Sequence, residues 1–234
     1  EQLDDSPSLK TIRAFLEAIP DGKLLDRLRQ WRGRGRDDYP VTVLWGVMLL
    51  TIVLRHSTIE ACLAELNRNG PLRRLIGIES ESQVPKKWNI SRFQAVLGQE
   101  PHLSLLREVF DVMVQRLGEV VPDLGERTAG DASALKARHA RGREATCNVD
   151  GLPEPAGGRK EYHDDAGRIV KVMEWFGYKF HLLVDVRHEV ILAWQISSTK
   201  TGDNEMLPIL LDQASKNLPD GRIKTLAYDK ACDD

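Results

Sequence analysis

The hydrophobic periodicity of the chain changes near Glu126, and this change constrains the fold more than any other feature of the sequence. Before it, apolar residues recur every three or four positions, which is typical of amphipathic helices. After it, residues 178–184 and 190–196 place an apolar side chain at every second position, on either side of a short polar connection. This pattern predicts an antiparallel β-hairpin. We therefore expect a mixed protein of the α+β or α/β class.

The first half predicts a helical N-terminal domain over residues 1–125. Helical spacing of apolar residues covers residues 9–19, 24–28, 59–66 and 103–117. Ser57 and Glu60 have the spacing of a capping box, which predicts a helix start at Ser57. The 14-residue stretch 41–54 is largely apolar. It predicts a buried helix, because a membrane span needs about 20 such residues. Short helices with tight turns are compatible with helix-turn-helix DNA binding and equally with a plain helical bundle.

The second half, residues 126–234, predicts a mixed sheet with flanking helices. Residues 138–168 are rich in glycine, proline and charge, and predict a loop insertion on the surface. A helix is expected after Asp203 or Asn204, followed by a strand over residues 223–228 that leads into Asp229. Residues 128–133 predict a further strand that is weak by propensity, because alanine and glycine are poor strand formers.

Charge and cysteine content exclude several classes of protein. The chain has 33 Lys and Arg against 35 Asp and Glu, a net charge of -2, which excludes a protein that is basic throughout. Two local clusters are basic, and each can face phosphates or form a solvated surface. They are Arg27, Arg29, Arg32, Arg34 and Arg36, and Lys136, Arg138, His139, Arg141 and Arg143. The three cysteines are far apart and form no CxxC, which excludes a disulfide scaffold and indicates a reducing, cytoplasmic compartment. The acidic first residues lack the apolar core of a signal peptide.

Three short segments together resemble DDE transposases of bacterial insertion sequences. They are Ala129-Gly130-Asp131-Ala132-Ser133, Gly177-Tyr178-Lys179-Phe180-His181 and Asp229-Lys230-Ala231-Cys232-Asp233. The resemblance spans roughly residues 40–234. It implies a ribonuclease-H-like catalytic domain with one Asp on the first strand, a second Asp after the fourth strand and a Glu on a later helix. The Ala-Cys after Lys230 differs from the Gly-Tyr that is usual in the family.

The resemblance implies an enzyme that cuts DNA and joins its strands with the help of Mg²⁺ or Mn²⁺. Two divalent ions about 3.5–4 Å apart can stabilise the attacking and the leaving oxygen of a phosphodiester. On this basis Asp131 and Asp229, which are 98 positions apart (229 − 131), are the expected catalytic residues and metal ligands. The expected DNA contacts are Lys136, Lys179, His181 and Lys230. Lys179 and His181 lie on one strand face, which can also be a simple exposed polar face.

The expected partners are element ends and target DNA, bound by a nucleoid-associated homo-oligomer with no membrane association. The chain ends five positions after Asp229, before any helix that carries the Glu. We therefore expect a C-terminally truncated catalytic domain with an incomplete active site, and a polypeptide that does not transpose DNA by itself. Two alternatives stay open: a non-catalytic DNA-binding or interaction module, and an unrelated ribonuclease-H-like nuclease that acts on RNA or structured DNA.

Overall fold

The computed structural model describes residues 6–33, 39–137 and 149–228. The chain forms two compact units, Glu1–Phe110 and Asp111–Asp234. The first unit is helical, and the second contains a mixed sheet with flanking helices, so the predicted mixed α+β class is confirmed. Helix α7 (His102–Val120) spans the boundary between the units. The sequence predicts the division after residue 125, which lies beyond the end of α7, whereas the two units divide within α7, after Phe110.

The helical unit is built around α3 (Val41–Val53), which is buried on most of its sides. Around it lie α1 (Pro7–Ala18), α2 (Gly22–Arg32), α4 (Ile59–Arg68), α5 (Gly70–Arg74), the 3₁₀ turn η2 (Glu81–Gln83), α6 (Lys87–Leu97) and the first half of α7. The expectation that the apolar stretch 41–54 forms a buried helix is confirmed. In the part of the chain that the structure describes, no helix has the length and apolar character needed to cross a membrane.

Helix α4 begins one residue later than predicted. Thr58, not Ser57, is its N-cap, and the Thr58 hydroxyl accepts a hydrogen bond from the backbone N–H of Ala61 at 3.2 Å. Both residues can serve as caps, because Ser and Thr share the hydroxyl acceptor. Thr58 has the extended backbone conformation that is typical of an N-cap residue, and its side chain therefore caps the first turn of α4.

The sheet of the second unit is mixed. Its strands are β1 (Arg127–Lys136), β2 (Ala156–His163), β3 (Ile169–Asp185), β4 (Val190–Ser198) and β5 (Thr225–Ala227). They follow the order β2-β3-β1-β5, and β4 also pairs with β3. All pairs are antiparallel except β1 with β5, which is parallel. The predicted hairpin is therefore confirmed as β3 and β4, and the weak strand prediction as β1.

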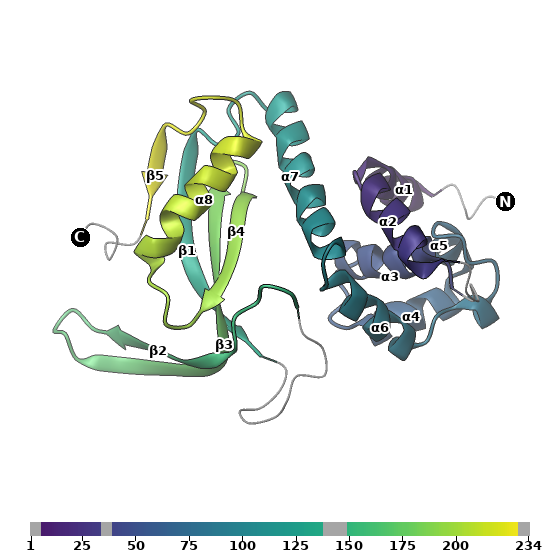
Figure 1. The fold of residues 1–234 in the computed structure, drawn as a ribbon, viewed down its shortest axis with the longest axis horizontal. Coiled ribbons are helices and arrows are strands. Elements are labelled where there is room, and N and C mark those ends of the chain that lie inside the picture. The colour runs from purple at the N-terminus through teal and green to yellow at the C-terminus, as the bar shows by residue number, and fades with distance from the viewer. Residues whose placement is uncertain (1–5, 34–38, 138–148, 229–234) are drawn as a thin grey trace. The chain divides into compact units, whose positions relative to one another are not determined.

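Helix α8 (Asp203–Asn217) lies across one face of this sheet (Figure 1). Leu210 and Ala214 of α8 are fully buried, as are Leu183 of β3 and Leu192 of β4. The second half of α7 is tied to α8, because Asp111 accepts hydrogen bonds from the side chains of Gln213 at 3.1 Å and Asn217 at 2.7 Å. Burial of these apolar side chains between helix and sheet stabilises the unit.

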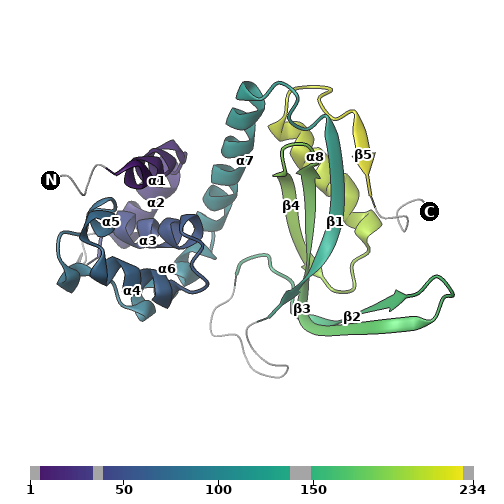
Figure 2. The same ribbon diagram turned by 180° about the vertical axis from the view of Figure 1, so that it is seen from behind.

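Strand β2 and the first half of β3 form a two-stranded ribbon that projects from the rest of the sheet (Figures 1 and 2). We call residues 156–177 the arm. The prediction of a surface loop over residues 138–168 is wrong for residues 156–163, because they form β2. The glycines of β2 conceal its strand character, and β2 becomes ordered by pairing with β3, which begins at Ile169 and not at residue 178.

Gly177 lies at the point where the arm leaves the sheet. Its φ is +155°, and a Cβ at this position would overlap the backbone carbonyl of Leu135 on β1. Only glycine combines this conformation with such a close approach of two strands. The segment Gly177-Tyr178-Lys179 therefore turns β3 from the arm into the sheet.

Candidate functional site

Asp131 occupies the middle of β1, between β3 and β5. It pairs with Leu182 of β3, and its side chain is exposed. Its Oδ1 accepts a hydrogen bond from the backbone N–H of Ala132 at 2.7 Å. Within the described residues no Lys, Arg or His forms an ion pair with Asp131. The carboxylate is therefore not used in a salt bridge that stabilises the sheet.

The neighbour of β1 on the other side is β5. Its parallel pairs with β1 are Arg127–Thr225, Thr128–Leu226 and Ala129–Ala227. The ring of Tyr228, the next residue, lies against Gly130, where a Cβ would overlap the ring atom Cε2. The chain therefore still follows β1 at Tyr228. The other predicted ligand, Asp229, and the predicted DNA contact Lys230 lie outside the described residues.

Lys179 and His181 are held within the protein. The Lys179 ammonium group lies 3.0 Å from Oδ1 of Asp203, the first residue of α8, and donates to the carbonyl of Thr201 at 2.9 Å. The His181 side chain is fully buried, and its Nε2 lies 2.7 Å from the hydroxyl of Ser197. The alternative of an exposed polar face is therefore wrong, because these side chains connect β3 to the start of α8.

The environment of His181 favours its neutral form. Burial lowers the pKa of His181, and this effect is opposed by the negative charge of Asp203, whose Oδ1 lies 3.7 Å from Nδ1. Lys179 also lowers this pKa, and Asp131 raises it. Removal of the imidazole from water dominates, because burial penalises the charged form. The side chain is thus a neutral packing group beside the candidate site, with no surface to offer DNA in this structure.

The remaining basic residues of the predicted clusters differ in their availability. Lys136 is the last residue of β1, opposite Gly177, and is exposed. Arg29 on α2 pairs with Asp26 at 2.7 Å, and Arg32 donates to the carbonyl of Tyr39. Arg34 and Arg36, and residues 138–143 of the second cluster, lie outside the described residues. Of the second cluster, the described residues include Lys136, and its side chain is exposed.

Part of the chain matches a known family of protein domains. Residues 1–95 match the family model of the Transposase domain (DUF772). The match supports a transposase family, and such a family suggests DNA as a partner. Searches of the curated proteins and of the solved structures gave no match.

The helical unit carries an exposed surface that the sequence patterns did not predict. A cavity of about 450 Å³ is lined by Trp31, Arg32, Trp88 and Arg92, among others. Both tryptophans are more than half exposed, and the Arg92 guanidinium lies 5.8 Å from the centroid of the Trp88 ring. Exposed aromatic and arginine side chains are typical of binding surfaces. The signal in the sequence is the placement of these tryptophans next to arginines and lysines, at Trp31-Arg32 and Lys87-Trp88.

Among the described residues, no group of three or more His, Cys, Asp or Glu side chains is arranged to hold a metal ion. Asp185 on β3, which is opposite Thr128 of β1, is a buried carboxylate that the fold itself uses. Its oxygens accept from the N–H groups of Gly125 at 2.7 Å and His188 at 2.6 Å. The metal ligands and the cofactor therefore stay predictions.

Proposed function

We propose that this protein acts on DNA as a transposase of the DDE type, with Asp131 and Asp229 as its metal-binding carboxylates. The observation that carries the proposal is the parallel register of β1 and β5. The last pair is Ala129–Ala227, and each aspartate follows its own member of that pair by two residues. Continuation of the register would bring the two carboxylates side by side, on adjacent strands about 4.8 Å apart.

The order of the elements supports a ribonuclease-H-like assignment of the sheet. β1 lies between an antiparallel neighbour, β3, and a parallel neighbour, β5. Helix α8 makes the connection between β4 and β5 and covers one face. The resemblance implies the first Asp on the first strand and the second Asp after the fourth strand. Asp131 lies on β1, as implied, whereas Asp229 follows β5, the fifth strand in chain order, which is the parallel neighbour of β1.

The chemistry of Asp131 fits a divalent cation. Mg²⁺ and Mn²⁺ prefer carboxylate oxygens, and Mg²⁺ commonly takes one or two of them together with phosphate oxygens of the substrate. Asp131 is exposed and has no cationic partner among the described residues, so no basic side chain competes for it. When bound, the metal would stabilise charge on the attacking and leaving oxygens of the phosphodiester. The protein would supply the two carboxylates and hold them on adjacent strands.

Lys136 and Lys230 are the proposed phosphate contacts of the catalytic unit. Lys136 is exposed at the end of β1, and Lys230 directly follows Asp229 in the sequence. Lys179 has a positioning role instead, because its ion pair with Asp203 fixes the first turn of α8 against β3. His181 packs under the same turn. Both residues would then act on the site through the geometry of β3 and not through contact with DNA.

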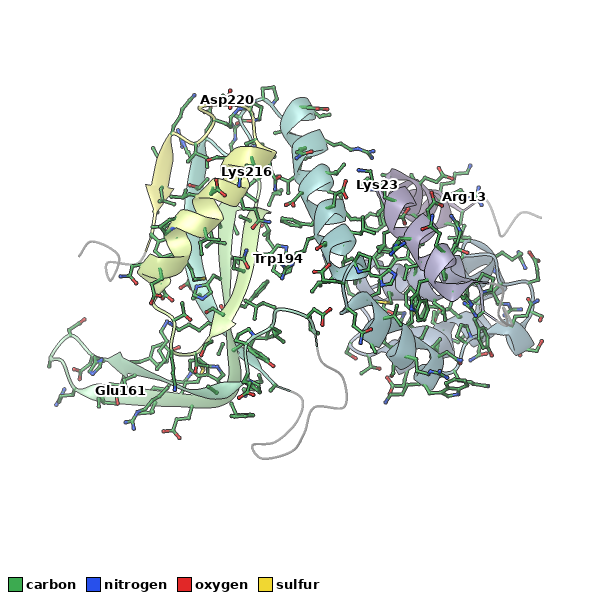
Figure 3. The ribbon with its side chains drawn as sticks, viewed as in Figure 1. Arg13, Lys23, Glu161, Trp194, Lys216 and Asp220 are labelled. Atoms are coloured by element: carbon green, nitrogen blue, oxygen red, sulfur yellow. The ribbon has the colours of Figure 1, made fainter. Side chains whose placement is uncertain are left out.

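A titration with Mn²⁺, followed by the electron paramagnetic resonance signal of the free ion, tests the proposal. We expect the full chain to bind Mn²⁺, and Asp131→Asn and Asp229→Asn each to weaken binding by tenfold or more. Asp220→Asn is the matched control, because Asp220 is an exposed carboxylate in the turn after α8 (Figure 3). Mn²⁺ affinity that is unchanged in both Asp131→Asn and Asp229→Asn would contradict the proposal.

The second candidate function is a non-catalytic DNA-binding module. The aromatic and arginine surface around Trp88 and Arg92 favours it, since that surface belongs to the transposase domain and needs no metal. Duplex DNA binding that persists in a chain without Mn²⁺ affinity would support this candidate over the first.

A further inference from the structure

The arm has two chemically different faces. Residues directly opposite each other in an antiparallel pair lie on the same face, and neighbours along a strand lie on opposite faces. The pairs Arg159–Glu174 and Glu161–Val172 therefore share one face, and the pairs Lys160–Met173 and Tyr162–Lys171 share the other. The distribution of charge between the two faces is the observation on which the inference depends.

The arginine of the first face is compensated by ion pairs within the arm. Arg159 lies 2.6 Å from Glu161 and 3.8 Å from Glu174. Glu161 is visible on the arm in Figure 3. At the tip of the arm, Arg168 pairs with Asp164 at 3.0 Å, and Asp164 also accepts from the backbone N–H groups of the turn. The arginines of the arm are therefore compensated.

The second face carries positive charge without compensation. We call Lys160, Tyr162 and Lys171 the lysine face. The ammonium groups of Lys160 and Lys171 lie 5.8 Å and 5.5 Å from the centroid of the Tyr162 ring. Neither lysine forms an ion pair within the described part of the chain. Cation–π attraction holds both ammonium groups to one ring, so they are presented together.

The base of this face is rigid. The Trp175 ring covers Gly158 of β2, where a Cβ would overlap it, and its Nε1 donates to the carbonyl of Tyr178 at 3.0 Å. The Thr199 hydroxyl donates to the carbonyl of Gly157 at 2.9 Å. These contacts fix the root of the arm to the sheet. The lysine face further out is exposed, so its charges are not used to stabilise the fold.

We propose that the lysine face of the arm binds the phosphate backbone of duplex DNA, as a contact separate from the carboxylates of the candidate active site. This inference rests on the proposed function, in so far as it takes DNA as the partner. A two-stranded β-ribbon has the dimensions that the major groove of B-DNA admits. The Tyr162 ring is occupied by two ammonium groups, so the face offers charge and not an open ring for stacking unpaired bases.

The test is fluorescence anisotropy of a labelled duplex titrated with the full chain, without divalent metal, over a series of salt concentrations. The variant Lys160→Gln/Lys171→Gln removes two uncompensated charges. Its matched control, Arg159→Gln/Arg168→Gln, removes two charges from the same arm that are already paired. We expect the lysine variant to bind about tenfold more weakly and to lose about 1.8 from the slope of log affinity against log salt, because each phosphate contact contributes about 0.9. The control should retain the slope of the unaltered chain.

Equal effects of the two double variants, or no effect of the lysine variant, would overturn the proposal. Absence of duplex binding by the unaltered chain would overturn it too, and so would a larger loss on single-stranded DNA or RNA than on the duplex. The Mn²⁺ titration separates this inference from the proposed function. If the unaltered chain binds Mn²⁺ but the lysine variant binds duplex DNA as tightly as the unaltered chain does, only the role of the arm is rejected. If the lysine variant shows the reduced salt slope but the unaltered chain binds no Mn²⁺, the arm is supported and the DDE site is rejected.

Discussion

The ring of Tyr228 rests on Gly130, in the space that a side chain at residue 130 would fill. This contact brings the chain that leaves β5 against β1, one residue before Asp131. It also explains why a strand of poor propensity lies inside the sheet. A larger residue at position 130 would push the two strands apart at the place where the proposed site requires them together.

The first prediction concerns Gly130→Ala. Its Cβ would overlap Tyr228, and overpacking of this kind costs roughly 1–3 kcal/mol. We expect faster amide hydrogen exchange in β1 and β5, and weaker Mn²⁺ binding, because the strand that leads to Asp229 must move. Gly157→Ala is the control, since nothing lies within 4 Å of its Cβ. Exchange in Gly130→Ala that matches the control would show that Tyr228 moves aside at no cost.

The second prediction is a pH dependence due to His181. Burial places the pKa of His181 in the folded protein below the ordinary value of about 6.5. Below about pH 6.5 the unfolded chain therefore takes up a proton that the folded protein resists. The free energy of unfolding should fall as the pH falls through this range, with at most about 1.4 kcal/mol per pH unit from this group.

His181→Gln should reduce this dependence, as measured by urea unfolding between about pH 7.5 and 5.5, roughly one unit either side of the ordinary pKa. Burial also lowers the pKa of His102 in the helical unit, so the unaltered chain carries both contributions. The difference between variant and unaltered chain isolates His181. His163→Gln, on the exposed end of β2, is the control. An unchanged pH slope in His181→Gln would refute the assignment.

The third prediction concerns Gly46 in the middle of α3. Helix propensity alone favours Gly46→Ala by about 1 kcal/mol. A Cβ at this position would lie 2.6 Å from Cγ2 of Ile76, so we expect a net loss of about 1–2 kcal/mol instead. Thermal unfolding with hydrogen exchange of α3 measures it. Gly22→Ala at the start of α2, with open space around its Cβ, should not destabilise the unit.

The fourth prediction concerns Asp185, whose buried carboxylate accepts hydrogen bonds from the backbone of Gly125 and His188. Each hydrogen bond to a charged group contributes roughly 1.5–3 kcal/mol. Asp185→Ala should therefore lower the free energy of unfolding by at least about 2 kcal/mol in a urea titration. The exposed Asp212→Ala, which loses a surface pair with Lys216, should cost less than about 1 kcal/mol. Similar losses in the two variants would contradict the role of Asp185.

Prediction from the sequence succeeded where the signal is local. The β3–β4 hairpin and the helices α3, α7 and α8 follow from spacing that a few neighbouring residues define. The prediction was incomplete for the arm. Gly157 and Gly158 are typical of loops, and they belong to a strand only because they pair with β3. The prediction left Lys179 and His181 as either DNA contacts or an exposed polar face, and their contacts with Asp203 depend on α8, which the spacing of the strand does not report.

The sequence by itself determined most of the helical and strand segments, the apolar character of α3 and the presence of one aspartate within a predicted strand and another just after one, because each depends on the local pattern of apolar and polar side chains. Only the tertiary structure decided the parallel register of β1 with β5, the burial of His181 against α8 and the separation of charge between the faces of the arm. The physical reason is that these features arise from contacts between residues distant in the chain. Gly130 and Tyr228 meet across nearly one hundred positions, and no local periodicity specifies which strands become neighbours.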